Sequence, residues 1–215
     1  MYNGLLYPGQ KQNNDKPLKE FKMKKIVTIT LVFGMALLFS FKAADKSTWS
    51  SDKNHSKLGF TITHLMVSDV EGWFKTFDAT ITTSNEDFSD ATAELTVDVN
   101  SINTDNEMRD KHLKSPDFFD AVKYPAITFK SKTFKKVSDT NYKVTGDLTM
   151  HGITKTVELD ALCRMGTNPQ TKQPIAGFKI TGKVKRTDFG IGASMGPAML
   201  GEEVSIIANA EFIKK

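Results

Sequence analysis

Residues 142–163, YKVTGDLTMHGITKTVELDALC, carry the clearest structural pattern in the chain. Small or apolar residues alternate with mostly polar ones from 142 to 150, and again from 157 to 163. This period of two is typical of β-strands that have one buried face and one wet face. His151-Gly152 lies between the two runs, and its length suits a two-residue turn. The stretch therefore predicts an antiparallel β-hairpin.

The same alternation recurs in six further segments, which brings the number of predicted strands to eight. These segments are 57–64, 70–83, 93–100, 127–132, 176–185 and 204–212. In 70–83 the alternation slips near Lys75-Thr76, as it would at a β-bulge. Eight amphipathic strands without long helical crossovers predict an all-β fold, either an antiparallel barrel or a sandwich.

One segment, 104–124, interrupts the strand pattern. Thr104-Asp105-Asn106-Glu107 matches a capping box, with Thr104 as the N-cap. Ser115-Pro116-Asp117 repeats a start signal, with proline at the first helical position. We therefore expect one or two short helices between the third and fourth predicted strands.

The N-terminal 44 residues differ from the rest of the chain. Met23-Lys24-Lys25 precedes the uncharged segment 26–41, and this order is typical of a secretory signal peptide over 23–44. Residues 1–22 are polar and aperiodic, and we interpret them as a disordered gene-model extension upstream of a start at Met23. An uncleaved N-terminal anchor is the alternative. Because a signal peptide directs export, we expect residues 45–215 to form a periplasmic or secreted domain.

The whole chain of 215 residues carries a formal net charge of +4, but its basic residues are unevenly placed. Seven lysines and two acidic residues lie in 1–44, which leaves 22 basic and 23 acidic residues in 45–215. The predicted mature domain thus has a net charge of −1, and it has no basic stripe interleaved with aromatics. Both observations argue against a nucleic-acid partner.

Few residues offer catalytic or metal chemistry. The four histidines have no metal-binding spacing, and no Gly-x-Ser-x-Gly nucleophile motif is present, so we expect no metal. The alternation places His64 with Phe60 and Ile62 on the inner face, either as a core histidine or as a group that orients a ligand head. Arg109 and His112 share one face of the predicted helix, which could simply be a salt-bridged rim of the barrel.

The aromatic content suggests an apolar interior. The chain has fifteen phenylalanines, and an eight-stranded barrel either fills with side chains or holds one small ligand. Small residues at inward positions favour a cavity, and these are Gly146, Ala161, Gly182, Ala208 and Ala210. The alternative, in which larger neighbours fill these gaps, stays open at this point.

Ordered motifs between Trp49 and Phe212 resemble the YceI family of bacterial polyisoprenoid-binding, lipocalin-like proteins. In chain order they are Trp49 with Asp52-x-x-His55-Ser56, Phe60-x-Ile62-x-His64-Leu65, Gly72-x-Phe74-x-x-Phe77, Ser101-Ile102-Asn103-Thr104, Arg109-Asp110-x-His112-Leu113-x-Ser115, Asp117-Phe118-Phe119-Asp120, Tyr124-Pro125-x-Ile127-x-Phe129-x-Ser131, Gly146-Asp147-Leu148-Thr149-x-His151-Gly152 and Arg186-x-Asp188-Phe189-Gly190. The resemblance covers nearly all of the predicted mature domain.

The resemblance implies an extended eight-stranded antiparallel lipocalin-like barrel with a hydrophobic cavity, and a homodimer. We also expect transient contact with a membrane. The resemblance further implies a long-chain amphiphilic ligand, such as a polyisoprenoid, a quinone tail or a fatty-acid derivative, and no other cofactor. The head group is expected near His64, Arg109 and His112. The chain is expected to contact Phe60, Ile62, Phe74, Phe77, Ile102, Leu113, Phe118, Phe119, Ile127, Phe129, Leu148 and Met150.

Two functional hypotheses follow from the residues and the resemblance. The first is a carrier or sequestering protein that binds such a lipid without catalysis. The second is an enzyme that acts on an isoprenoid or another lipid, with Asp110 and His112 as an acid–base pair.

Overall fold

The computed structural model describes residues 45–215, which form one antiparallel sheet with a short helix. The predictions for 1–22 and 23–44 concern residues outside this described part. The elements are β1 (Ser47–Ser51), β2 (Lys57–His64), β3 (Ser68–Phe74), β4 (Phe77–Thr83), β5 (Thr92–Asp98), the 3-10 turn η1 (Val99–Ser101), β6 (Ile102–Asn103), α2 (Glu107–Leu113), β7 (Ala126–Lys136), β8 (Asn141–Met150), β9 (Ile153–Thr167), β10 (Pro174–Lys185), η2 (Arg186–Phe189) and β11 (Leu200–Lys214).

The sheet closes into a barrel with eight positions around its wall. Strands follow the order β1-β4-β5-β7-β8-β9-β10-β11, and β11 pairs back onto β1. β1 and β2 occupy successive parts of the same edge of β11, and β3 and β6 extend the sheet beyond β2. The predicted antiparallel, eight-stranded, all-β barrel is thus confirmed, and closure leaves its central strands without a free edge.

The predicted strand 70–83 is two strands, β3 and β4, separated at Lys75-Thr76 where the alternation slips. The interruption lets one half of the segment pair with β2 and the other half with β1. β1 itself was not among the predicted strands, because STWSS is short and does not alternate. Its central Trp49 is 3% exposed, so burial of the indole anchors this strand.

The β8–β9 hairpin forms as predicted, with His151 and Gly152 as its turn. Their φ angles are 52° and 73°, the left-handed values that a type I′ turn requires at both positions. The His151 ring contacts the Phe189 carbonyl oxygen through Nδ1 at 2.9 Å, which helps to hold this non-glycine residue there.

The helical prediction for 104–124 is only partly correct. α2 begins after Asn106, whose side chain accepts a hydrogen bond from the Arg109 amide at 3.0 Å, so Thr104 is not the N-cap. The second helix does not form, since residues 115–124 make separate turns and Asp120 adopts a φ of 47°. A left-handed residue ends any helix that begins at Pro116.

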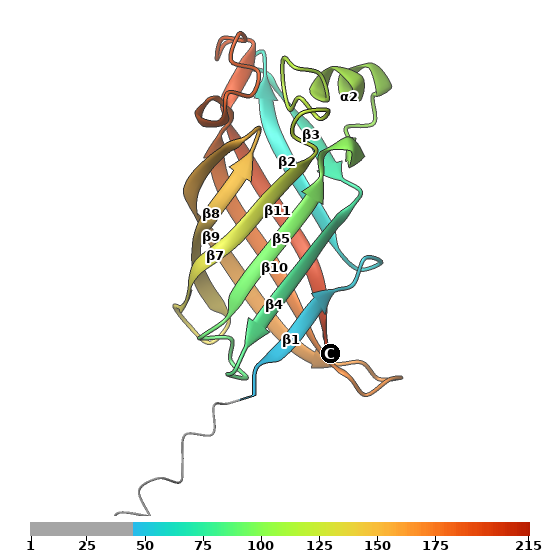
Figure 1. Ribbon diagram of the computed structural model, residues 1–215, viewed down its shortest axis with the longest axis vertical. Helices are drawn as coiled ribbons and strands as arrows, with labels where there is room; N and C mark the ends of the chain where they lie inside the picture. The colour runs from blue at the N-terminus through green and yellow to red at the C-terminus, as the bar shows by residue number, and fades with distance from the viewer. Residues whose placement is uncertain (1–44) are drawn as a thin grey trace, which may run out of the picture. The chain divides into compact units, whose positions relative to one another are not determined.

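Figure 1 shows α2 at one end of the barrel, with the C-terminus at the opposite end. We call these the α2 end and the C-terminal end. Aromatic rings close the C-terminal end: the Phe88 ring centroid lies 5.2 Å from that of Trp49 and 5.3 Å from that of Phe178. Phe178 also packs edge-on against Phe134 and Phe212. No helix within 45–215 has the length and apolar character needed to cross a membrane.

Candidate functional site

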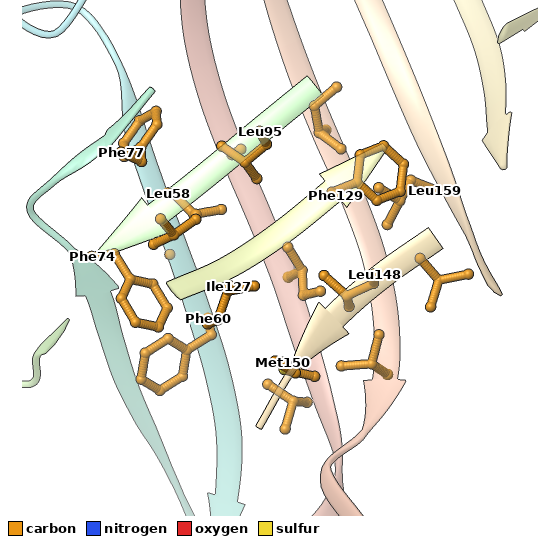
Figure 2. A pocket seen from close by; sticks show the side chains of 18 of the residues that line it. Leu58, Phe60, Phe74, Phe77, Leu95, Ile127, Phe129, Leu148, Met150 and Leu159 are labelled. Atoms are coloured by element: carbon orange, nitrogen blue, oxygen red, sulfur yellow. The ribbon is translucent and has the colours of Figure 1, made fainter. Parts of the chain in front are cut away.

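An apolar cavity of about 460 Å³ occupies the interior of the barrel (Figure 2). Of the 42 residues that line it, 34 are apolar. Ten of these side chains are labelled in Figure 2, and they come from strands on several sides of the barrel. A volume of this size lies within the range of small-molecule sites. An apolar lining favours a hydrocarbon chain over a polar ligand.

Small inward residues explain the cavity only in part. A Cβ at Gly146 would lie 2.5 Å from Cζ of Phe129, so the Phe129 ring already covers this glycine. Leu159 covers Gly182 in the same way, and Ala161 is buried without lining the cavity. The expectation that these three positions leave room is therefore wrong: the side chains of Phe129 and Leu159 cover the two glycines, and Ala161 does not line the cavity. Ala208 and Ala210 do line the cavity.

The cavity opens at the α2 end, where its lining residues are exposed. Met199 is 56% exposed, and the His112 side chain is 49% exposed. Towards the C-terminal end the lining stops at Phe178 and Phe212, behind which Trp49 and Phe88 are buried. We call the exposed opening the mouth. Five of the seven polar lining residues belong to this end: His64, Thr104, Arg109, His112 and Arg186.

The residues around α2 form a local hydrogen-bond network at the mouth. Arg109 donates from Nε to the Thr104 hydroxyl and from Nη2 to the Thr104 carbonyl oxygen, each at 2.8 Å. Asp110 accepts from the Thr104 amide at 2.8 Å and from its hydroxyl at 2.6 Å. Thr104, 4% exposed, thus holds both charged side chains in place.

This geometry does not form the hypothesised Asp110–His112 acid–base pair. The Asp110 carboxylate is bonded to Thr104, whereas His112 Nε2 lies 3.5 Å from Oδ2 of Asp117. Residues two apart on a helix do not face each other, which explains the separation. His112 also packs edge-on against the Phe118 ring, with centroids 4.9 Å apart.

The structure brings fourteen of the fifteen predicted contact residues to the cavity wall. The exception is Ile102, which is 3% exposed and pairs with Phe74 in the β3–β6 ladder but does not line the cavity. His64 lines the mouth and is exposed, so its interpretation as a core histidine is wrong. The roles of these residues as ligand contacts stay predictions.

Arg186 is a mouth residue that sequence reasoning missed. It is 3% exposed, and burial lowers the pKa of its guanidinium. All five of its N–H groups donate to backbone carbonyls, at 2.5–3.0 Å, and the acceptors belong to Ile191, Gly192, Met195, Leu200 and Gly201. Arg186 therefore ties the loop 190–199, which carries Met195 and Met199, to the start of β11. In the sequence Arg186 stands out only as part of the motif Arg186-x-Asp188-Phe189-Gly190, because the residues between two strands have no periodicity from which burial could be predicted.

One group of metal-ligating side chains occurs within 45–215, and it lies outside the cavity. Asp52, His55 and Glu211 place ligand atoms within 4.8 Å of one another. Oδ2 of Asp52 is 2.7 Å from Nδ1 of His55, and this contact raises the pKa of His55 and lowers that of Asp52. The Asp52–His55 hydrogen bond by itself accounts for the closeness of these two side chains.

Comparison with known proteins identifies the family. A model of the YceI-like domain matches residues 49–212. Protein YceI of Escherichia coli O17:K52:H18 is 38% identical over 183 residues, which cover 84% of this chain and 94% of that protein. The crystal structure of Burkholderia cenocepacia BcnA superposes with a TM-score of 0.66 at 27% identity, covering 75% of this chain and 98% of that one.

A structure described as a polyisoprenoid binding domain from Saccharophagus degradans, implicated in plant cell wall breakdown, has the same fold. Its TM-score is 0.56 at 15% identity, and the match covers 78% of this chain and 98% of that one. The length of the family match and the identity to the Escherichia coli protein together decide the classification. The chain belongs to the family of YceI-like domain proteins.

Proposed function

We propose that this protein binds a long-chain amphiphilic lipid in the barrel cavity and carries or sequesters it, without a catalytic step. The observation that carries the proposal is the apolar cavity of about 460 Å³ inside a closed barrel. The polyisoprenoid binding described for the Saccharophagus degradans domain is in accord with it. A polyisoprenoid, a quinone tail or a fatty-acid derivative has the chemistry that the cavity fits.

Burial of the chain supplies the driving force. Each methylene moved from water into an apolar site contributes about 0.8 kcal/mol, so about ten methylenes contribute about 8 kcal/mol. Before the cost of association, this corresponds to a dissociation constant of roughly 1 μM. A polar ligand of similar size would leave its hydrogen-bonding groups unpaired against the apolar wall.

The lipid head group belongs at the mouth in this proposal. His64, Arg109 and His112 are polar lining residues of that end, and Arg109 is fixed by two hydrogen bonds to Thr104. The C-terminal end offers aromatic side chains such as Phe178 and Phe212 instead. The chain would therefore enter tail first, with its polar end left near water.

We further propose that residues 23–44 direct export to the periplasm or the outside of the cell, and that the mature protein is a homodimer. The sequence pattern of 23–44 and the family resemblance support these points. N-terminal sequencing of protein from fractionated cells tests export, and a cytoplasmic protein that retains 23–44 would contradict it. Light scattering after size exclusion measures the oligomeric state, and a monomer would refute the dimer.

The decisive experiment is native mass spectrometry of gently purified protein, followed by lipid extraction. We expect a co-purified lipid in the wild type. Ala208→Trp places an indole in the cavity, and displacement of about three methylenes would weaken binding by about 2.4 kcal/mol, or roughly fiftyfold. Asn209→Trp is the matched control, because Asn209 is the next residue of β11 and is exposed on the outer face.

Two results would count against the proposal. The first is a wild type that never carries lipid and takes up none of the three lipid classes. The second is equal lipid binding by the Ala208→Trp and Asn209→Trp variants, which would place the ligand outside the cavity.

A further inference from the structure

Exposed apolar side chains gather beside the mouth. Leu65, Met66 and Val67, which connect β2 to β3, are 49%, 72% and 84% exposed. Met199, from the loop before β11, is 56% exposed, and its carbonyl oxygen accepts a hydrogen bond from the Leu65 amide at 3.0 Å. Single exposed apolar residues are common on soluble proteins, but a contiguous group of four is a candidate interaction site. We call these four residues the apolar tip.

The backbone holds the apolar tip in an unfavourable conformation. Leu65 and Met66 have φ angles of 53° and 60°, in the left-handed region that glycine or asparagine normally fills. The turn is closed by the Val67 amide, which donates to the His64 carbonyl oxygen at 3.2 Å. Strain of this kind is found where function requires a particular side chain. The presence of large apolar residues at a turn that favours glycine therefore suggests that their side chains have a function.

The apolar tip is continuous with the cavity. His64, the last residue of β2, lines the mouth and directly precedes Leu65. Met199 belongs to both the tip and the cavity lining. Figure 1 shows the β2–β3 connection at the same end of the barrel as α2. A hydrocarbon chain that leaves the mouth therefore meets apolar side chains before it meets water.

The shape of the tip favours a lipid bilayer over a protein partner. A stable protein interface buries about 800 Å² on each side over a complementary surface. A three-residue turn with one neighbouring methionine is too small for that, whereas hydrocarbon accepts apolar side chains without shape complementarity. Nearby charges are of both signs: Asp69 accepts from the Thr63 hydroxyl, and Lys183 pairs with Glu203. The four residues of the apolar tip carry no charge themselves, so we expect them to insert without a preference for anionic lipids.

We propose that Leu65, Met66, Val67 and Met199 insert into the interfacial layer of a lipid bilayer and dock the mouth on the membrane. This inference rests on the proposed function, because docking gives an insoluble lipid a path from bilayer to cavity without crossing water. Binding by apolar insertion depends little on lipid charge or on salt.

The test is flotation of the purified full chain with phosphatidylcholine vesicles. We expect the Met66→Ser/Val67→Ser double variant to bind these vesicles at least tenfold more weakly than wild type. The matched control is Met165→Ser/Val137→Ser, since these residues are 54% and 62% exposed and lie towards the C-terminal end. All three proteins carry the same residues 1–44, so a difference between them reports on the tip alone.

Three results would overturn the proposal: a double variant that floats as well as wild type, vesicle binding that requires anionic lipid and disappears in salt, or a dimer that the double variant dissociates. Native mass spectrometry on the same samples separates this inference from the proposed function. A wild type that floats but carries no lipid would refute the lipid carrier and leave docking intact. Lipid-loaded protein that never floats would refute docking alone.

Discussion

Replacement of Arg186 by methionine should destabilise the barrel at its mouth. The five N–H groups of Arg186 satisfy five backbone carbonyls, and the bonds to Ile191 and Gly192 are fully buried. Leaving a buried acceptor without a partner costs about 1–3 kcal/mol, so these two carbonyls together cost about 2–6 kcal/mol. Removal of a desolvated guanidinium offsets part of this cost. We expect the free energy of unfolding to fall by about 3 kcal/mol.

Urea unfolding, monitored by the fluorescence of the buried Trp49 and the half-buried Trp73, measures this change. For a domain of this size, 3 kcal/mol corresponds to a decrease in Tm of about 6–12 °C. Lys185→Met is the control, because it removes the same charge and introduces the same side chain at an exposed neighbour. Arg186→Lys should have an intermediate effect, since an ammonium group has only three donors.

The reasoning would be refuted if Arg186→Met unfolded within about 1 kcal/mol of Lys185→Met. That result would mean that water or the relaxed loop satisfies the carbonyls. Hydrogen exchange offers a local readout: the amides of 192–199 should exchange faster in Arg186→Met, because the loop loses its anchor at the mouth.

Three further outcomes are expected. Gly146→Ala should lower the free energy of unfolding by about 1–3 kcal/mol, since its Cβ would clash with the ring that covers it, whereas Gly177→Ala, with nothing closer than 3.8 Å, should be tolerated. Burial raises the pKa of the Cys163 thiol to about 11, so a thiol reagent at pH 8 should label it only in denaturant. The hydrogen bond from Thr83 lowers the pKa of Asp90 to about 2. Its stabilising effect should therefore be complete above about pH 4 and lost as the pH falls towards 2, and Asp90→Asn should lack this part of the pH dependence of urea unfolding.

Predictions that rest on local alternation agree with the structure. The hairpin at His151-Gly152 is visible in the sequence, because turn chemistry acts over a few residues. Side-chain parity also located the irregularity at Lys75-Thr76, although the structure has a break between two strands there instead of the expected β-bulge. Parity also points Phe60 and His64 towards the interior, and the cavity wall contains both. The start of the helix was less predictable, because Thr104 and Asn106 are both residue types that favour the N-cap position. In the structure the Thr104 hydroxyl is bonded to Arg109 and Asp110, and Asn106 is the N-cap.

The barrel was expected from the resemblance of the sequence motifs to the YceI family, and the pairing of β11 with β1 confirms it. The amino-acid alternation predicted an all-β fold whose strands have one apolar and one polar face, because burial of one strand face is encoded with period two, but it left a barrel and a sandwich both open. It did not determine which inward positions leave space. Gly146 is covered by Phe129, whereas Ala208 faces the cavity, and this difference depends on neighbours across the barrel. The tertiary structure alone also revealed that Arg186 anchors the loop beside the mouth and that an exposed apolar turn borders it. Such features arise from contacts between residues distant in the chain, which no local pattern records.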